Sequence, residues 1–539
     1  MLARKAVLVV LNDIIGATLG YIALYLILRE FGAFQYGILA FGLGFVRLYG
    51  LLTNLGFNRS HLKRVSEGKD LGQCIGLFIM FKFGLLVLFN GALILSMYTW
   101  TDVMGRGFQT QEHVTVIYVL LLYINLVAIS QIFTVTFNGL LEIAKSQIPR
   151  IVGNVIRLVA TIFVALTGTR DNAAVLLAWT FVLGGAVELA GALWLFRGYP
   201  VARPTRQLFW SYMKFGIPSM VLTSMIMITV NIDKVMLQAF WSAADVGRYA
   251  AAQRIVLIVG FVSTAISSVV MPSISGLHSR GEHRRIQDLV NRTERYLLLG
   301  AIPPIVLFLT LPDRVVYILL YNRSDPDILL VLALWMLIVV VNTPYRALLQ
   351  GADRPDIMAR VGVLQATASI GLNLLFIPVA ILGVTVFGWR GLGAAVATLL
   401  TQLVISGYLR YQGYRIAGVR SNPRHILVLP AAVGMAVTLM LIDGLVPATR
   451  WYHLAAFGLL GLAVYAGLLF LLRQIDHEDI AFFMRTVHPG AMARYIQGEL
   501  RGDDGPVRRR ERRPPRHGGR AGSNRGGFLP AHKGRIPRR

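Results

Sequence analysis

Ionisable side chains lie inside long apolar segments of this chain, where an unpaired charge is costly. A charge at the centre of a bilayer costs at least about 2.5–3.5 kcal/mol, so such a side chain usually faces a cavity or a partner. Cations outnumber anions among these residues. The candidate cations for a ligand-binding cavity are Arg47, Lys82, Arg157, Lys234, Arg254 and Arg346.

A cavity lined with Arg and Lys suits an anionic ligand. Guanidinium groups match phosphate oxygens in a two-pronged geometry that an ammonium cannot copy. The pattern therefore predicts a ligand that carries a phosphate or a diphosphate. A simpler interpretation stays open for Arg157 and Arg346, which lie near segment ends, where long side chains can reach the interface. Asp233 and Lys234 could likewise form a pair at a segment boundary.

Three carboxylates lie within the apolar segments: Asp13, Glu188 and Asp233. Asp13 could bind a proton or Na⁺ and couple transport to an ion gradient, or it could pair with Arg157 or another cation. Glu188 could equally be a structural partner of a neighbouring cation. These three are our candidates for ion coupling, and beyond such an ion we expect no cofactor.

Enzyme chemistry has no candidate residues here. The sequence has no Gly-x-x-x-x-Gly-Lys-Ser/Thr phosphate loop and no pair of His ligands on one helix face. Its single cysteine, Cys74, allows neither a disulfide within the chain nor a Cys/His metal cluster. We therefore expect no catalytic residue, no metal site and no enzyme activity.

Composition identifies the elements that must position these side chains. The chain has 539 residues, 55% hydrophobic and 15% charged, whereas soluble domains carry about 25% charged residues. A spanning helix needs about 20 mostly apolar residues, and long continuous runs favour helices over a barrel. We predict an all-α polytopic membrane bundle of about 14 transmembrane helices, at residues 6–28, 36–57, 72–98, 113–137, 151–168, 173–196, 212–239, 245–271, 292–320, 327–350, 358–385, 391–409, 425–446 and 451–473.

Basic residues are unevenly distributed between the connections. Alternate connections, together with the N-terminus, hold 23 Lys and Arg residues, and the others hold 7. Because basic residues stay on the cytoplasmic side, this bias predicts a multi-pass protein of the cytoplasmic membrane. An even number of spans places both termini in the cytoplasm.

An internal repeat divides the chain. The stretch that contains Gly37 resembles the one that contains Gly247, 210 residues later, and the stretch at Gly68 resembles the one at Gly281, 213 residues later. Two parallel six-helix repeats of this kind place a substrate path between them. We predict an N-lobe (1–196), a C-lobe (197–410), two extra helices (411–473) and a cytoplasmic tail (474–539), disordered after about residue 500.

The tail is rich in Arg and Gly, beginning with Arg501-Gly-Asp-Asp-Gly-Pro. It could be solvated, or it could bind anionic lipid at the cytoplasmic leaflet. We expect no nucleic-acid partner, since no folded reader module accompanies it.

Sequence motifs in the second half resemble a known family. The stretch from Asn231 to Arg254 resembles the Asp-Lys…Val-Gly-x-Tyr-x-x-Ala signature of polysaccharide-transporter flippases, as do Asn373-Leu-Leu-Phe-Ile-Pro and Gly388-Trp-Arg-Gly-Leu-Gly-Ala-Ala-Val-Ala-Thr. The segment from Gly56 to Asp70 is similar to archaeal members. The resemblance runs from about residue 5 to about residue 473 and indicates the O-antigen-type oligosaccharide flippases of the multidrug/oligosaccharidyl-lipid/polysaccharide exporter superfamily.

The resemblance implies a V-shaped bundle of two lobes that works by alternating access. It implies movement of a polyprenyl-diphosphate-linked oligosaccharide to the outer leaflet, for surface polysaccharide or glycoprotein glycan assembly. Expected partners are the lipid-linked oligosaccharide, membrane lipids, and a glycan polymerase or glycosyltransferases. Alternatives are a multidrug-type exporter or a peptidoglycan-precursor flippase of the same superfamily, and a non-transporting scaffold for glycan assembly. The carrier lipid and the glycan stay open.

Overall fold

The chain folds almost entirely into helices. The computed structural model describes residues 2–103, 108–321, 325–352, 354–472 and 474, so the predicted disordered tail lies outside the described residues. The helices are α1 (Leu2–Gly50), α2 (Phe57–Ser66), α3 (Leu71–Tyr98), α4 (Gln111–Gly139), α5 (Ile143–Thr167), α6 (Ala173–Leu195), α7 (Arg206–Phe240), α8 (Ala243–Val256), α9 (Phe261–Ser279), α10 (His283–Thr310), α11 (Pro312–Leu320), α12 (Pro326–Val341), α13 (Thr343–Gly351), α14 (Pro355–Phe376), α15 (Arg390–Ala417), α16 (Leu429–Leu445) and α17 (Trp451–Leu471).

The predicted all-α membrane bundle is confirmed. Among the described residues, ten helices are long and apolar enough to cross a membrane, and α16 is a shorter apolar helix. The count of 14 spans is not fully confirmed by that criterion. One of the ten, Asn12–Thr53, covers two predicted segments, and neither α7 nor the α8–α9 pair is among the ten.

Helix α1 contains the first two predicted segments, separated by a break at Gly32. The backbone there has φ 78° and ψ −179°, a region that glycine enters without a Cβ clash. The chain therefore reverses direction within one assigned helix. The two parts of α1 can then line the same interior from two sides.

The predicted segment 358–385 is wrong at its C-terminal end. Helix α14 ends at Phe376, and Ala380–Ile381 (β1) pairs antiparallel with Val384–Thr385 (β2). Pro378 contributes to the early end, because proline has no N–H to donate to the carbonyl four residues earlier. Leu382 and Gly383 both have positive φ, as a two-residue hairpin turn requires.

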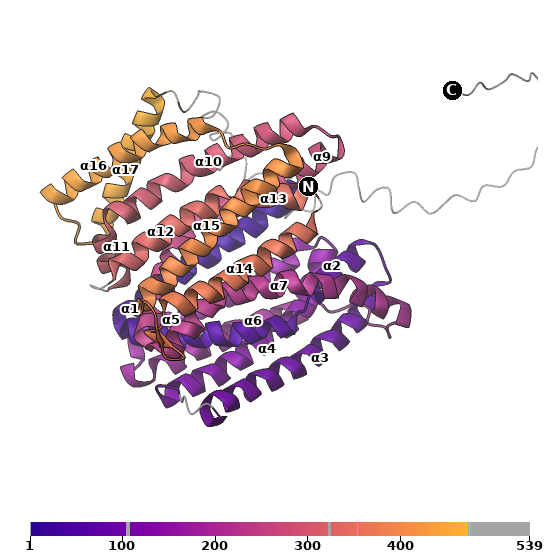
Figure 1. The fold of residues 1–539 in the computed structure, drawn as a ribbon. Helices are drawn as coiled ribbons and strands as arrows, with labels where there is room; N and C mark the ends of the chain where they lie inside the picture. Colours follow the sequence, from indigo (N-terminus) through magenta and orange to yellow (C-terminus); the bar gives the residue numbers. More distant parts are fainter. Residues whose placement is uncertain (1, 104–107, 322–324, 353, 473, 475–539) are drawn as a thin grey trace, which may run out of the picture. The chain divides into compact units, whose positions relative to one another are not determined.

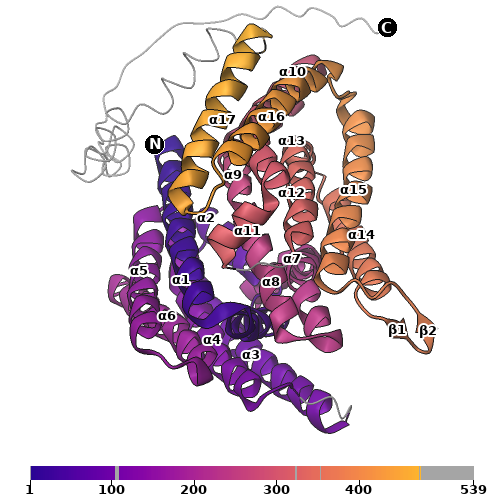
Figure 2. The same ribbon diagram turned by 90° about the vertical axis from the view of Figure 1, so that its left-hand side faces the viewer.

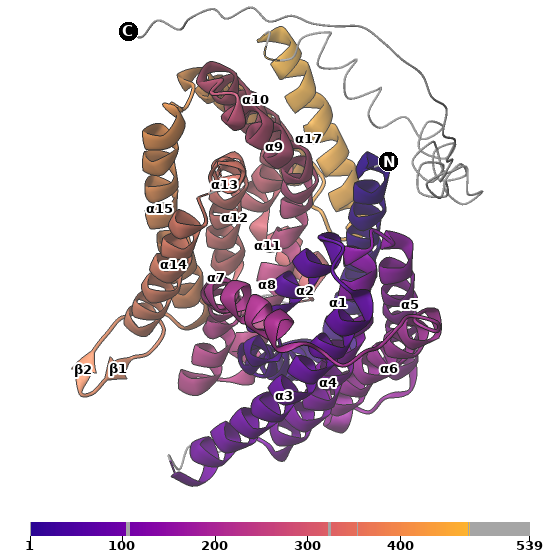
Figure 3. The same cartoon turned by 90° about the vertical axis from the view of Figure 1, so that its right-hand side faces the viewer.

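We keep N-lobe (1–196) and C-lobe (197–410) as names for the two predicted ranges of the chain, and Figure 1 shows helices of each range packed beside one another. In the N-lobe the main neighbours are α5 with α6 and α4 with α6, and in the C-lobe α14 with α15 and α12 with α15. The pair α16–α17 packs on α10, and Figure 2 shows it beside α10 and away from the hairpin. Figure 3 shows α14 and α15 side by side above the hairpin.

The most extensive contact between the lobes is the crossing of α1 and α8. A Cβ on Gly37 would lie 2.6 Å from the carbonyl carbon of Ala243, and one on Gly247 would lie 2.9 Å from that of Ala33. The carbonyl oxygens would be closer still. The two glycines that the sequence repeat relates therefore meet each other, backbone against backbone. The basic connections lie at one end of the bundle, which we call the basic end. We call the other end the opposite end, and the α1–α8 crossing lies toward it.

Helix α2 packs against α4 and α7 at the basic end. Its His61 is fully buried, stacks on Phe78 at 4.1 Å, and lies 2.9 Å from the Tyr212 hydroxyl and 2.8 Å from the Thr136 hydroxyl. Burial, together with the nearby positive charge of Lys82, lowers the pKa of His61 to about 3. The ring is therefore neutral near pH 7, with both nitrogens satisfied by hydroxyl groups.

Candidate functional site

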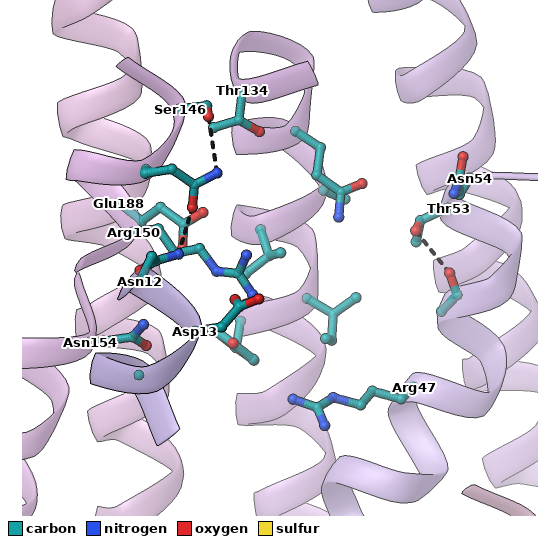
Figure 4. Close-up of a pocket in the computed structure, with 18 of the residues that line it drawn as sticks. Asn12, Asp13, Arg47, Thr53, Asn54, Thr134, Ser146, Arg150, Asn154 and Glu188 are labelled. Carbon is teal, nitrogen blue, oxygen red and sulfur yellow. Dashed lines mark hydrogen bonds between the residues drawn. The ribbon is translucent and has the colours of Figure 1, made fainter. Parts of the chain in front are cut away.

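A cavity of about 670 Å³ lies among helices of the N-lobe and is completed by Met227 of α7 and Arg254 of α8. Its walls come from both parts of α1 and from α4, α5 and α6. Most of the lining residues lie in the halves of these helices nearer the basic end. Figure 4 shows the labelled polar side chains on two facing walls.

A second cavity of about 250 Å³ adjoins the first toward the opposite end. Arg47, Arg157 and Arg254 line both cavities. Three guanidinium groups from α1, α5 and α8 thus stand at the boundary between the two spaces. None of the three forms an ion pair with a carboxylate among the residues that the structure describes. Like charges gathered without a directly ion-paired carboxylate favour binding of an anion.

Aromatic rings contact two of these guanidinium groups, and a glycine leaves room for one of them. The Arg157 guanidinium lies 4.7 Å from the ring centroid of Phe181, and that of Arg254 lies 5.7 Å from the ring centroid of Tyr21. The Tyr21 hydroxyl donates to the backbone carbonyl of Arg254 at 2.6 Å. Gly20 leaves room for Arg254, since a Cβ there would lie 2.6 Å from its Nη2 atom.

Lys234 adds a fourth cation, on the wall of the smaller cavity. Its Nζ atom donates to Gln253 Oε1 at 2.8 Å and to the carbonyl of Val230 at 3.2 Å. Both partners are neutral, so the ammonium charge is not cancelled by them. The positive charge of the boundary therefore extends toward the opposite end.

The wall facing Arg47 has mixed charge. Asp13, Arg150 and Glu188 line the larger cavity, and Figure 4 shows their side chains grouped together across the space from Arg47. The Ser130 hydroxyl donates to Glu188 Oε1 at 3.4 Å. Uncharged amides complete this cavity, namely Asn12, Asn54, Gln131, Asn138, Gln147 and Asn154.

Family membership follows from the sequence itself. Residues 2–278 match the family described as "Polysaccharide biosynthesis protein", just over half of the 539 residues. The chain belongs to the polysaccharide biosynthesis protein family. The predicted resemblance to polysaccharide-transporter flippases is confirmed.

Two curated relatives of this family member come from Haloferax volcanii. "Probable low-salt glycan biosynthesis flippase Agl15" is 23% identical over 405 residues, which is 74% of this chain and 81% of the relative. "Probable flippase AglR" is 28% identical over 265 residues, which is 46% of this chain and 52% of the relative. Among solved structures, the "Lipid II flippase MurJ, inward closed conformation" superposes with a TM-score of 0.68 at 14% identity, covering 85% of this chain and 98% of that chain. That likeness shows a shared fold.

Two predicted cavity cations of this polysaccharide biosynthesis protein line neither cavity. Lys82 is fully buried and donates to the carbonyl of Thr53 at 3.1 Å and to Gln131 Oε1 at 2.9 Å. It therefore supports the wall from behind, since both partners line the larger cavity. Arg346 lies on α13 in the C-lobe, where it donates to Gln365 Oε1 at 3.3 Å. The apolar sequence around each gave no sign of which way the helix faces.

Asp233 and Lys234 do not form the boundary pair that the sequence left open. They are adjacent on α7 but line different cavities. Lys234 lines the smaller central cavity, and Asp233 lines a neighbouring cavity of about 210 Å³ that shares Val230, Gln253 and Leu257 with it. Asp233 is 2% exposed. Its carboxylate accepts hydrogen bonds from the Tyr249 hydroxyl at 2.7 Å, Asn373 Nδ2 at 2.7 Å and the Thr398 hydroxyl at 3.4 Å.

Sequence reasoning missed most of the uncharged lining, and it counted Arg150 among the 23 basic residues of the connections rather than among the cavity cations. A signal was present on α5, where the lining residues Gln147, Arg150, Asn154 and Arg157 recur at spacings of three and four. That spacing places them on one face of a helix. A search for polar stripes would have found this wall.

Proposed function

We propose that this protein is a flippase that moves a polyprenyl-diphosphate-linked oligosaccharide across the cytoplasmic membrane by alternating access, without catalysing a reaction. The observation that carries the proposal is the boundary formed by Arg47, Arg157 and Arg254. These three guanidinium groups form no ion pair among the described residues, and each can donate two parallel hydrogen bonds to phosphate oxygens. The names of the two curated relatives support a flippase, and that of Agl15 supports a role in glycan biosynthesis.

The larger cavity suits the sugar part of such a substrate. Amide side chains both donate and accept hydrogen bonds, as sugar hydroxyls require. Asn12 Oδ1 and Asn138 Oδ1 are buried and have no hydrogen-bond partner, so a ligand hydroxyl can donate to them. The glycan then occupies the amide wall while the diphosphate lies at the guanidinium boundary, and the polyprenyl tail stays in the bilayer.

The contact between α1 and α8 supports a direction for the proposed cycle. In this conformation the opposite end is closed by the backbone contact of Gly37 and Gly247. Substrate enters from the basic end, which we assign to the cytoplasm because basic connections stay inside. Both termini are then cytoplasmic, and the glycan leaves toward the outer leaflet. Glycosyltransferases that build the substrate, and a glycan polymerase that uses it, are the partners we expect.

Asp233 is the candidate for ion coupling that its surroundings support best. It is a buried carboxylate that lines a cavity of about 210 Å³, and Asn373 Oδ1 beside it is buried without a hydrogen-bond partner. Carboxylate, amide and hydroxyl oxygens suit a hard cation, so Asp233, Asn373 and Thr398 could hold Na⁺, or Asp233 could take a proton. Asp13 and Glu188 line the substrate cavity instead, where they would meet the glycan. An imposed Na⁺ or proton gradient should accelerate transport by the native protein, and Asp233→Asn should abolish that acceleration, whereas Asp13→Asn should keep it.

Transport in vesicles tests the main proposal. The purified full chain is reconstituted with a fluorescent polyprenyl-diphosphate oligosaccharide, and arrival at the other leaflet is measured with an impermeant quencher. A hydrogen bond to a charged group contributes about 1.5–3 kcal/mol, so Arg47→Gln or Arg254→Gln should slow transport at least tenfold. Arg280→Gln, an exposed arginine at the basic end, is the matched control. Equal transport by all three variants would overturn the proposal and favour a scaffold that does not transport.

The alternatives differ in what they would carry. A multidrug-type exporter of cations would need an acidic cavity, whereas this boundary is basic. A peptidoglycan-precursor flippase shares the fold, so the test is substrate competition. A lipid-linked oligosaccharide without peptide should compete fully, and competition by a lipid-linked muropeptide alone would favour that alternative.

A further inference from the structure

A third cavity lies at the basic end of the C-lobe, apart from the space assigned to the substrate. It has a volume of about 370 Å³ and shares no lining residue with the two central cavities. Four helices form it: α9, α13 at its end, α14 at its start, and α15. Its polar lining consists of His278, Arg354, Arg360, Gln412 and Arg415.

The charge of this cavity is positive and only partly compensated. Arg354 pairs with Asp356 at 3.0 Å, at a site where both side chains are about half exposed. Arg360 and Arg415 have no carboxylate partner within the described part of the chain. The Arg415 guanidinium lies only against the ring of Tyr411, 5.9 Å from its centroid. Two guanidinium groups from facing helices therefore remain available to one anion.

Uncharged polar groups in the same cavity also lack partners. Gln412 is 7% exposed and lines the cavity, and its side-chain amide makes no hydrogen bond to any residue that the structure describes. The Nδ1 atom of His278 is buried without a partner. A buried polar atom that makes no hydrogen bond is costly, so this arrangement favours a ligand or water that supplies the missing partners.

We propose that this cavity is a second anion site, which binds a phosphate group at the basic end of the C-lobe. Arg360 and Arg415 would hold the phosphate oxygens, and the Gln412 amide and the His278 imidazole would bind its remaining oxygens or an attached polar group. The phosphate belongs either to the headgroup of a lipid or to a soluble phosphate compound. The site goes beyond the proposed transport function, since no residue of the substrate cavities contributes to it.

A phosphate bound at this site should affect the movement of α14 and α15. A bound phosphate bridges α14 and α15, which carry Asn373 and Thr398, two of the three residues that donate to Asp233. Linking the ends of these helices restrains their relative movement. Phosphate binding at the basic end should therefore favour one conformation of the C-lobe over another.

Binding to the purified full chain tests the site. All measurements use a background protein that carries Arg47→Gln and Arg254→Gln, so that the central site does not contribute to binding. The further substitutions are introduced into this background protein. Inorganic diphosphate, titrated by calorimetry, probes a soluble ligand. Nanodiscs of phosphatidylcholine with or without phosphatidylglycerol, followed by native mass spectrometry of retained lipid, probe a headgroup. The test variant is Arg360→Gln with Arg415→Gln, and the matched control is Arg280→Gln with Arg284→Gln, both exposed at the basic end.

A soluble phosphate compound and a lipid headgroup predict different results in this experiment. If the ligand is soluble, diphosphate binds the background protein, the test variant binds at least tenfold more weakly, and the control is unchanged. If it is a lipid, phosphatidylglycerol is retained by the background and control but lost from the test variant. Equal loss in test and control variants, or no binding of either probe to the background protein, overturns the proposal. Should the test variant fail to fold, Gln412→Leu removes the amide and no charge, and undiminished binding of both probes by it would overturn the site.

Discussion

Substitution of Gly37 by alanine should open the opposite end of the transporter. The added Cβ would lie 2.6 Å from the carbonyl carbon of Ala243, whereas ordinary contacts need about 3.4 Å or more. The carbonyl oxygen of Ala243 would be closer still, so helices α1 and α8 must separate by more than about 1 Å. The atoms that clash are backbone atoms, which cannot rotate away as a side chain could.

The magnitude follows from the cost of overpacking. Inserting a methyl group into a packed contact costs about 1–3 kcal/mol. Only the conformation with α1 and α8 in contact bears this cost, so the equilibrium shifts toward the open conformation by about 5- to 150-fold.

Cysteine labelling measures that shift. The native Cys74 is fully buried, so an added cysteine dominates the signal. Ala40→Cys lies one turn beyond Gly37, on the wall of the smaller cavity, and is reached from the opposite end only when α1 and α8 part. An impermeant maleimide added at that end should react at least fivefold faster when Gly37→Ala is present.

Gly91→Ala is the matched control, because no atom lies within 4 Å of a Cβ at that helical position. It should leave the labelling rate unchanged. Equal rates for the Gly37 and Gly91 variants would refute the assignment of the α1–α8 crossing as the closed gate.

Three further predictions follow from other contacts. Gly20→Val should displace the Arg254 guanidinium, since a Cβ at position 20 would lie 2.6 Å from Nη2. Transport should then slow about tenfold. The melting temperature should not fall, because the flexible Arg254 side chain can move aside. Gln109→Ala removes two hydrogen bonds that join the lobes, one donated to the carbonyl of Trp241 at 3.0 Å and one accepted from the N–H of Ala243 at 3.1 Å. Each contributes about 1 kcal/mol. Their loss should raise the labelling rate of the cysteine at position 40 at least fivefold. The pKa of His61, lowered to about 3 from 6.5, predicts that stability falls as pH drops below 6.5, because the unfolded chain binds the proton and the folded one does not; between pH 7.5 and 5.5 the loss should be about 1.3 kcal/mol.

Each of these predictions has its own control. Gly16→Ala should keep transport, since its Cβ would make only an ordinary contact of 3.4 Å with Asn154. The Gln109 result fails if labelling stays at the native rate. For His61, the pH dependence of unfolding in detergent should flatten in His61→Gln, and an equal slope in that variant would contradict the buried, neutral imidazole.

Local sequence determined the class of fold. Long apolar runs can satisfy their backbone groups in a bilayer only as helices, so the membrane bundle followed from composition. The repeat located Gly37 and Gly247, two positions that turn out to touch. It could not show that contact, since 210 residues separate them and only the packing of the lobes joins them.

Charge alone predicted which residues are costly in a membrane, and packing decided what each one does. Arg47, Arg157 and Arg254 come from three helices, and their convergence on one boundary depends on the break at Gly32 and on the α1–α8 crossing. Lys82 satisfies the same sequence criterion, but its helix turns it toward Thr53 and Gln131. Rotation of a helix about its axis is set by neighbours distant in sequence, and an apolar sequence with little periodicity does not encode it. The sequence thus determined that the chain crosses a membrane and carries buried cations, and only the tertiary structure decided which cations share a cavity.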